Sequence, residues 1–178
     1  MKAWLKLAST VAGLSCVACA NQGGAGGSEP APGAAATLRD ASGATKAEAR
    51  LAESSEGVTI RLQATGMNPG SYGFHVHAVG RCDPPDFTSA GPHWNPTGRQ
   101  HGKENPQGMH LGDLPNLSIA SDGTGSLDAT IMGATLRDGA NAVLDADGAA
   151  LMIHAGPDDY RTDPSGESGA RVACGVVS

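Results

Sequence analysis

The chain has 178 residues, which is enough for one domain together with a targeting segment and a linker. It contains 26 glycines and 11 prolines but only two residues each of Trp, Tyr and Phe, and this density of glycine and proline excludes a helical bundle or a coiled coil. The net charge of −6, from 12 basic and 18 acidic residues, argues against a nucleic-acid-binding protein, because such domains usually carry a basic patch.

Residues 1–20 have the three-part pattern of a secretory signal peptide. Two lysines precede an apolar stretch over residues 7–18, which is too short to predict a membrane-spanning helix. Cleavage after Ala20 fits an A-x-A site, whereas lipidation of Cys19 would anchor the protein to a membrane as a lipoprotein. Cys16 stands where lipoprotein signals usually have leucine. Both alternatives predict an exported protein, either free in the periplasm or anchored and facing it.

Residues 21–37 are mostly Gly, Ala, Pro and Ser with a single charge, and they predict a flexible linker. We expect the folded domain to span residues 38–178. Within it only Cys82 and Cys174 remain after export, and a far-separated pair in an oxidising compartment predicts a disulfide.

Short runs that alternate polar and apolar residues follow from residue 38 onward, separated by turn signals such as Asp-Gly and Asn-Pro-Gly. Eight of these runs predict strands, and none predicts a helix: near Leu38, 46–51, 58–64, 72–79, 117–120, 126–132, 149–154 and 171–177. Eight short strands favour an all-β closed barrel or sandwich. The remaining long irregular loops, 80–115 and 155–170, are expected to be functional or disordered.

His75 and His77 lie in the predicted strand 72–79. Residues i and i+2 of a strand point to the same face, so the two imidazoles can bind one metal ion. Taken alone, an H-x-H pattern more often marks a pair of surface histidines.

Three histidines and an aspartate follow in the long loop: His93, His101, His110 and Asp113. This donor set suits tetrahedral zinc, which binds nitrogen and oxygen at about 2.0–2.2 Å. The spacings match no known zinc finger, but they would let the loop wrap around an ion. The alternative is three solvated loop histidines beside an aspartate in a turn.

His154 ends the apolar run 149–153, where a lone histidine is more often a satisfied core residue than a ligand. A copper site made of His154, the H-x-H pair and one more histidine, together with a zinc site of three histidines and Asp113, needs eight donors. Only seven candidates exist, so one imidazole would have to bridge both ions through its two ring nitrogens. His93, at the junction of the two sets, is the natural choice.

Four motifs in this order resemble the copper/zinc superoxide dismutase family, and most closely its exported bacterial members: GFHVH (73–77), TSAGPHWNP (88–96), HLGDLPN (110–116) and ARVACGVV (170–177). The resemblance covers the chain from residue 38 to the C-terminus. It implies an eight-stranded Greek-key β-barrel with two long functional loops.

The resemblance also implies a role for each matching residue. The implied copper ligands are His75, His77, His93 and His154. The implied zinc ligands are His93, His101, His110 and Asp113. The other implied roles are an intrasubunit disulfide, an arginine beside copper that attracts the substrate, and an aspartate behind the ligands that links the two metal sites: Cys82–Cys174, Arg171 and Asp158.

The implied reaction converts two superoxide ions and two protons into dioxygen and hydrogen peroxide. Copper would cycle between Cu(II) and Cu(I), while zinc would have a structural role. His93, released from copper and protonated, would deliver a proton to the peroxide. Arg171 would focus an anionic substrate that the mature chain, with ten basic and eighteen acidic residues, otherwise repels.

Two residues depart from the family pattern. Ala78 stands where an acidic residue is frequent, and Glu167 places negative charge near the path of the substrate.

Two other functions compete with the dismutase: a non-catalytic metal-binding protein on the same barrel, and a zinc hydrolase. The first would lack a copper ligand or the arginine, and the second would need an open zinc position, which Asp113 fills. The sequence leaves open whether the chain is a monomer or a dimer.

Overall fold

The computed structural model describes residues 1–2 and 33–178. Most of the predicted signal peptide, with Cys19, and most of the predicted linker lie outside the described residues. Within the described part, no helix has the length and apolar character needed to cross a membrane.

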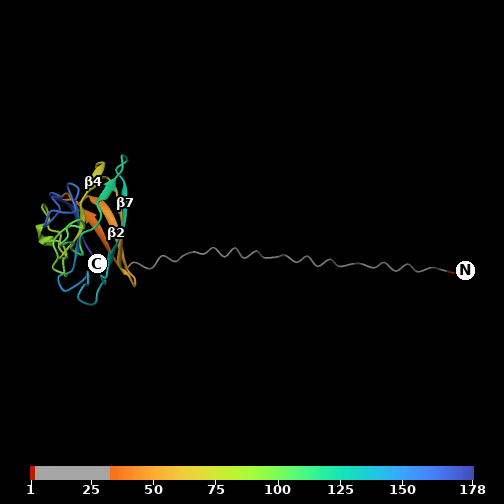
Figure 1. The fold of residues 1–178 in the computed structure, drawn as a ribbon. Coiled ribbons are helices and arrows are strands. Elements are labelled where there is room, and N and C mark those ends of the chain that lie inside the picture. The colour runs from red at the N-terminus through yellow and green to blue at the C-terminus, as the bar shows by residue number, and fades with distance from the viewer. Residues whose placement is uncertain (3–32) are drawn as a thin grey trace.

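The domain is built from antiparallel strands, as predicted (Figure 1). Its strands are β1 (Ala34–Arg39), β2 (Thr45–Glu53), β3 (Gly57–Ala64), β4 (Gly70–Tyr72), β5 (Phe74–His77), β6 (Leu117–Ile119), β7 (Gly125–Met132), β8 (Ala150–His154) and β9 (Arg171–Val176). Seven of them form one curled sheet in the order β5-β8-β9-β1-β2-β3-β7, and β4 pairs with β6. The helical structure of the described residues is a single 3-10 turn, Thr88–Ala90.

Two boundaries differ from the sequence prediction. The predicted strand 72–79 is divided at Gly73, because β4 pairs with β6 whereas β5 pairs with β8. The Gly73 N–H instead donates to Gly156 O at 2.7 Å, and the Gly73 carbonyl accepts from His154 N at 2.8 Å. At the other end, β1 begins at Ala34, four residues before the expected start of the domain, and its small alanines alternate between buried and exposed positions.

The core follows the two-residue periodicity of the strands, which places alternate aliphatic side chains inside the curled sheet. Because aromatic residues are scarce, the fully buried large side chains are mostly aliphatic: Leu38, Leu51, Ile60, Leu62, Leu117, Leu151, Met152 and Ile153, together with Phe74. Both β5 and β8 are buried along their whole length. Polar side chains on these two strands are therefore shielded from water.

Irregular segments connect the strands near the polar end of the core. The segment between β5 and β6 and the segment between β8 and β9 are the two long loops that the sequence predicts. A disulfide between Cys82 and Cys174 ties the first of these loops to β9, as expected. A third irregular segment, residues 133–149, connects β7 to β8 across the sheet order.

Candidate metal centre

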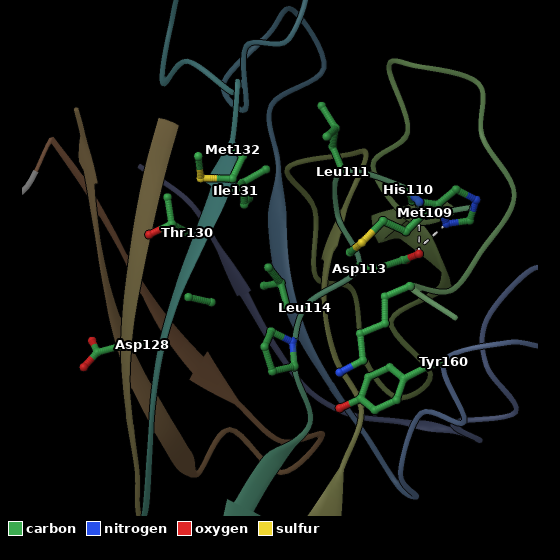
Figure 2. Close-up of a pocket in the computed structure, with 13 residues that line it drawn as sticks. Met109, His110, Leu111, Asp113, Leu114, Asp128, Thr130, Ile131, Met132 and Tyr160 are labelled. Carbon is green, nitrogen blue, oxygen red and sulfur yellow. Dashed lines mark hydrogen bonds and ion pairs between the residues drawn. The ribbon is translucent and has the colours of Figure 1, made fainter. Parts of the chain in front are cut away.

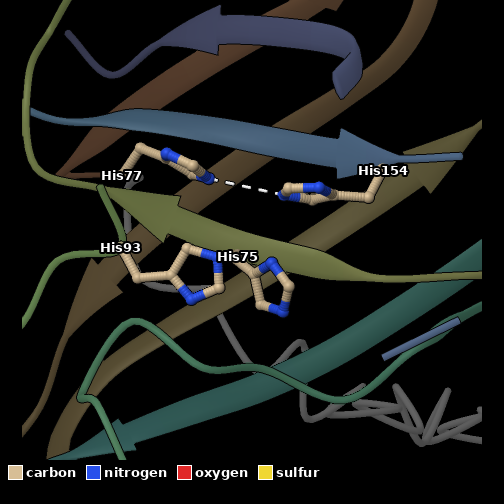
Figure 3. Close-up of side chains that lie close together, drawn as sticks. All are labelled: His75, His77, His93 and His154. Carbon is tan, nitrogen blue, oxygen red and sulfur yellow. Dashed lines mark hydrogen bonds between the residues drawn. The ribbon is translucent and has the colours of Figure 1, made fainter. Parts of the chain in front are cut away.

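Four buried imidazoles face one another between β5, β8 and the loop that follows β5 (Figure 3). Strand periodicity places His75 and His77 on the same face of β5, and His154 ends the neighbouring strand β8. The Nε2 atoms of His77 and His154 are 3.4 Å apart. The ring of His93 lies 4.0 Å from that of His75, measured between centroids. We call the four residues His75, His77, His93 and His154 the copper group.

The loop reaches β5 by running alongside it as two short stretches. His93 is bridged to His77 and Asp113 to His75, both in antiparallel fashion. Gly112, next to Asp113, joins the second stretch to the first and to β5: its N–H donates to Trp94 O and its carbonyl accepts from Val76 N, both at 2.9 Å. A β-carbon at Gly112 would lie 2.5 Å from Val76 O, so only glycine permits this approach.

A second cluster consists of His93, His101, His110 and Asp113, and we call it the zinc group. Three Nδ1 atoms converge on Asp113 Oδ1, at 2.9 Å for His93, 2.9 Å for His101 and 3.1 Å for His110. The donors of a tetrahedral zinc ion at about 2.1 Å lie roughly 3.4 Å from one another, which is close to this spacing. The cluster is therefore of a suitable size and chemistry for zinc.

The unpartnered polar atoms of the described residues also point to metal binding. Three buried side-chain nitrogens make no hydrogen bond: His75 Nδ1, His93 Nε2 and His101 Nδ1. The last of these lies near Asp113 Oδ1 without hydrogen-bonding geometry. A buried nitrogen without a partner costs free energy, and each of these belongs to the copper group, to the zinc group or, for His93, to both. Both donor sets therefore fit bound metal ions.

Most of the histidines also make a hydrogen bond through the ring nitrogen that points away from the metal groups. His77 Nδ1 donates to Gly91 O at 2.9 Å, and His154 Nδ1 donates to Gly169 O at 3.2 Å. These bonds fix the tautomer that leaves Nε2 free to face the copper group, an arrangement usual for metal-bound histidines.

Asp158 connects the two groups through its carboxylate. Its Oδ2 accepts from His75 Nε2 at 2.7 Å, and its Oδ1 accepts from His101 Nε2 at 2.9 Å. Since the carboxylate satisfies one nitrogen of each ring, these three residues form a structural link rather than a third metal site. His93 makes the other connection, because its Nδ1 faces Asp113 and its Nε2 faces the copper group.

Three members of the copper group, His77, His93 and His154, are kept neutral by their surroundings. Burial, together with the charge of nearby His93, lowers the pKa of His77 from 6.5 to about 2. Burial also lowers the pKa of His93 to about 4 and that of His154 to about 3. Metal binding requires neutral imidazole, so these rings can bind an ion without first releasing a proton at neutral pH.

The zinc group carries charge instead. Burial alone would lower the pKa of His101, but contacts with the carboxylates of Asp113 and Asp158 raise it to about 9. Burial opposes ionisation of Asp113, yet close contacts with His101, His110 and His93 hold the pKa of this carboxyl well below its ordinary value. A buried anion among imidazoles is a strong attractor for a divalent cation.

Arg171 lies beside the copper group at the start of β9, directly across the ladder from His154. It is half-buried, and its guanidinium donates to Phe87 O and to Gly91 O, both at 2.7 Å. Both carbonyls belong to the loop that the disulfide ties to β9. The exposed side chain of Glu167 belongs to the loop between β8 and β9, and Ala78 is bound through its backbone to Pro92 O.

The structure brings together the seven predicted ligand residues, with Asp158 behind them and Arg171 opposite His154. It also assigns contacts that sequence reasoning missed. Asn116 binds the backbone of Asp158 on both sides, accepting from its N–H at 2.8 Å and donating to its carbonyl at 2.9 Å. Tyr160 donates its backbone N–H to Asp158 Oδ1. Asn116 lies inside the motif at 110–116, but nothing in the sequence indicated its partner.

Comparisons with known proteins agree with this geometry. Residues 42–177 match the family model described as copper/zinc superoxide dismutase. The chain is 44% identical over 132 residues to Cu-Zn superoxide dismutase 1 of Aquifex aeolicus, covering 73% of this chain and 78% of that protein. It is 39% identical over 147 residues to the Cu-Zn superoxide dismutase of Caulobacter vibrioides, covering 81% and 84%.

Among solved structures, a SOD-like protein from Bacillus subtilis matches with a TM-score of 0.77 and 39% sequence identity, over 80% of this chain and 96% of that one. The curled sheet is thus the Greek-key β-barrel of SOD-like folds, as the sequence predicted. On the family model and on these relatives, the chain belongs to the copper/zinc superoxide dismutase family.

Proposed function

We propose that this protein is an exported superoxide dismutase. The observation that carries the proposal is the pair of four-donor groups that share His93, with Arg171 beside one of them. His75, His77, His93 and His154 would hold copper, and the zinc group would hold zinc. Bound there, copper supplies the one-electron redox chemistry that turns two superoxide ions and two protons into dioxygen and hydrogen peroxide, while zinc has a structural role.

The residues of the chain prepare the substrate and the protons. Arg171 offers a fixed positive charge beside the copper group, and a local cation concentrates a small anion in a domain that otherwise repels it. His93 Nε2 faces the copper group without a hydrogen-bond partner, so it is the atom at which a proton can be held and passed to the peroxide product. Asp158 keeps the His75 ring in place by accepting from its Nε2.

Arg171→Glu tests the substrate role. We expect this variant to lose at least 10-fold in superoxide turnover while it keeps both metals, because the charge that attracts the anion is reversed. Arg50→Glu is a matched control, since it makes the same change in net charge at an exposed position on β2. Turnover should be measured at low and high salt, together with metal content by elemental analysis. Equal turnover of the two variants at low salt would rule out the role of Arg171.

Metal analysis of the wild-type chain separates the dismutase from the alternatives. One copper and one zinc per chain, with turnover that disappears when copper is removed, would support the proposal. Zinc alone, with no superoxide turnover after copper loading, would indicate a non-catalytic binding protein or a hydrolase. That result would contradict the proposed dismutase activity.

We further propose that the protein is exported through its N-terminal 20 residues and is either released into the periplasm or anchored through a lipidated Cys19. The Cys82–Cys174 disulfide supports export, because such bonds persist in oxidising compartments. The mass of the mature N-terminus distinguishes the forms: acyl chains on Cys19 for the lipoprotein, or an unmodified Asn21 for the released domain.

A further inference from the structure

His110 differs from the other five histidines in how the outer nitrogen of its ring is held. Four of the other rings hydrogen-bond through this nitrogen: His77 to Gly91 O, His154 to Gly169 O, and both His75 and His101 to the carboxylate of Asp158. The fifth, His93, directs its two nitrogens toward the two metal groups. The outer nitrogen of His110, Nε2, has no such hydrogen bond among the described residues. It faces Asp163 Oδ1 at 4.0 Å.

The orientation of the His110 ring gives this contact a chemical meaning. Its Nδ1 lies 3.1 Å from Asp113 Oδ1, and Figure 2 shows the other ring nitrogen on the side away from Asp113. When a neutral imidazole binds a metal ion through Nδ1, its proton is on Nε2. A carboxylate near that N–H fixes the ring orientation and makes the ligand more basic. At 4.0 Å the contact is electrostatic, because a hydrogen bond would be shorter.

Asp163 also holds a second member of the zinc group. The same oxygen, Oδ1, accepts from the backbone N–H of His101 at 2.6 Å. The ring of His101 is separately bound to Asp158. Asp163 therefore contacts one zinc-group residue through its backbone and another through its ring.

Contacts between the two long loops fix the position of Asp163, which lies in the loop between β8 and β9. Tyr160 O accepts from Glu104 N at 3.0 Å, and Arg161 forms an ion pair with Glu104 at 2.6 Å. Glu104 follows His101 closely in the loop between β5 and β6, so the segment that carries Asp163 is attached next to the histidine that it binds. The Asp163 side chain is 45% exposed and can be substituted without opening the core.

We propose that Asp163 is a positioning residue of the zinc group, which holds His101 in place through its backbone and His110 through its ring. The inference rests on the proposed binding of zinc at this group. The negative charge of Asp163 favours the ring orientation in which Nδ1 of His110 faces the group and the protonated Nε2 faces outward. Asp158 and Asp163 thus divide the work: the first secures the rings of His75 and His101, and the second secures His110.

Zinc retention of the full chain against a chelator tests this proposal. Asp163→Asn keeps an oxygen that can accept from His101 N–H but removes the charge that faces His110, and it should weaken retention by about 10-fold. Asp163→Ala removes both contacts and should weaken retention further. Asp159→Asn is the matched control, because it makes the same change in charge in the same loop, where Asp159 accepts from the N–H groups of Arg161 and Thr162. It should retain zinc as the wild type does.

A spectroscopic measurement separates positioning of the ring from a general effect on the loop. In ¹⁵N-labelled, zinc-loaded and copper-free protein, the Nε2–H proton of His110 should shift upfield in Asp163→Asn, while that of His75 stays unchanged. Unchanged thermal unfolding verifies that each variant keeps the fold.

The outcomes distinguish this inference from the proposed function. A wild-type chain that binds no zinc would contradict both. A wild-type chain that binds zinc, with equal retention in Asp163→Asn and Asp159→Asn or an unmoved His110 resonance, would overturn the role of Asp163 alone.

Discussion

One carbonyl oxygen, that of Gly91, joins Arg171 to the copper group. It accepts from His77 Nδ1 at 2.9 Å and from Arg171 Nη2 at 2.7 Å. The second arm of the guanidinium binds Phe87 O. Because a planar guanidinium can span two carbonyls and a lysine ammonium is a single point, the position of the charge depends on arginine itself.

At the same scale, Asn116 fixes Asp158 and through it both metal groups. Asn116→Ala removes the two bonds to the Asp158 backbone, so the carboxylate should hold His75 and His101 less firmly. We expect copper and zinc retention against a chelator to weaken by about 10-fold, since partners of metal ligands typically contribute 10- to 100-fold in affinity. Asn141→Ala is the control, because it removes a single side-chain bond to Gly133 O in the segment 133–149. Equal retention in the two variants would contradict the prediction.

The side chains that could bind metal were predictable from the sequence, and the family resemblance also indicated Asp158 behind them, whereas the other groups that hold the site in place were not predictable. Imidazole and carboxylate donors are recognisable by residue type. The carbonyls of Phe87, Gly91 and Gly169 are backbone groups, which every residue has, so no residue type identifies them. Asn116 is recognisable as polar, but its partner lies 42 residues away.

At the scale of elements, the disulfide connects β9 to the loop that supplies both carbonyl partners of Arg171. The same bond therefore stabilises the fold and helps to position the charge. Phe87 and Gly91 follow Cys82 in that loop, and Arg171 precedes Cys174 in β9.

Cys82→Ser should reduce the free energy of unfolding by about 4–5 kcal/mol, because it releases a loop closed across a sequence separation of 92 residues. Denaturant unfolding of the oxidised wild type and of the variant measures this loss. The double variant Cys82→Ser/Cys174→Ser should unfold at the same denaturant concentration as the single variant. A midpoint unchanged from wild type would show that the bond does not stabilise the domain.

Strand positions were largely predictable from the alternation of polar and apolar residues, but the places where strands change partners were not. The division at Gly73 depends on contacts with residues 154 and 156, which lie across the fold. The early start of β1 at Ala34 was missed because alanines without bulky neighbours resemble a linker. Hydrophobic patterning is a weak guide where the buried side chains are small.

At the scale of the whole molecule, the metal-free domain should lose stability as the pH falls from about 6.5 to about 4. Above pH 6.5 the buried His77, His93 and His154 are neutral in both the folded and the unfolded chain. Below it, the unfolded chain binds protons that the fold excludes, because burial lowers the pKa of each ring to about 4 or less. Each ring then costs about 2 kcal/mol at pH 5.

His101 contributes with the opposite sign. Because its pKa is raised to about 9, its stabilisation is complete below pH 6.5 and is lost as the pH rises through 9. Below pH 6.5, the three histidines whose pKa is lowered destabilise the fold by more than His101, whose pKa is raised, stabilises it. Thermal unfolding of chelator-treated protein between pH 4.5 and pH 8 measures the balance. A melting temperature that stays constant from pH 7 to pH 5 would contradict it.

A pocket of about 440 Å³ beside the zinc group shows which whole-molecule features were not predictable from the sequence (Figure 2). Its lining comes from separate segments near residues 103, 109–115, 128–132 and 160. No single strand carries an apolar stripe on its outer face, so the surface emerges only when the fold brings these segments together.

The placement of His93 between the two groups has a consequence for how the protein tolerates change. Its Nδ1 and Nε2 face different clusters, and among the twenty side chains only imidazole offers two such nitrogens on one rigid ring. Glutamine or asparagine could replace one contact but not both. In a library that samples every residue at every position and is selected for superoxide turnover, no substitution of His93 should be recovered. Substitutions at an exposed position such as Arg81 should be recovered freely. A single substitution at His93 would therefore disrupt both metal groups, and no other residue type could restore both contacts.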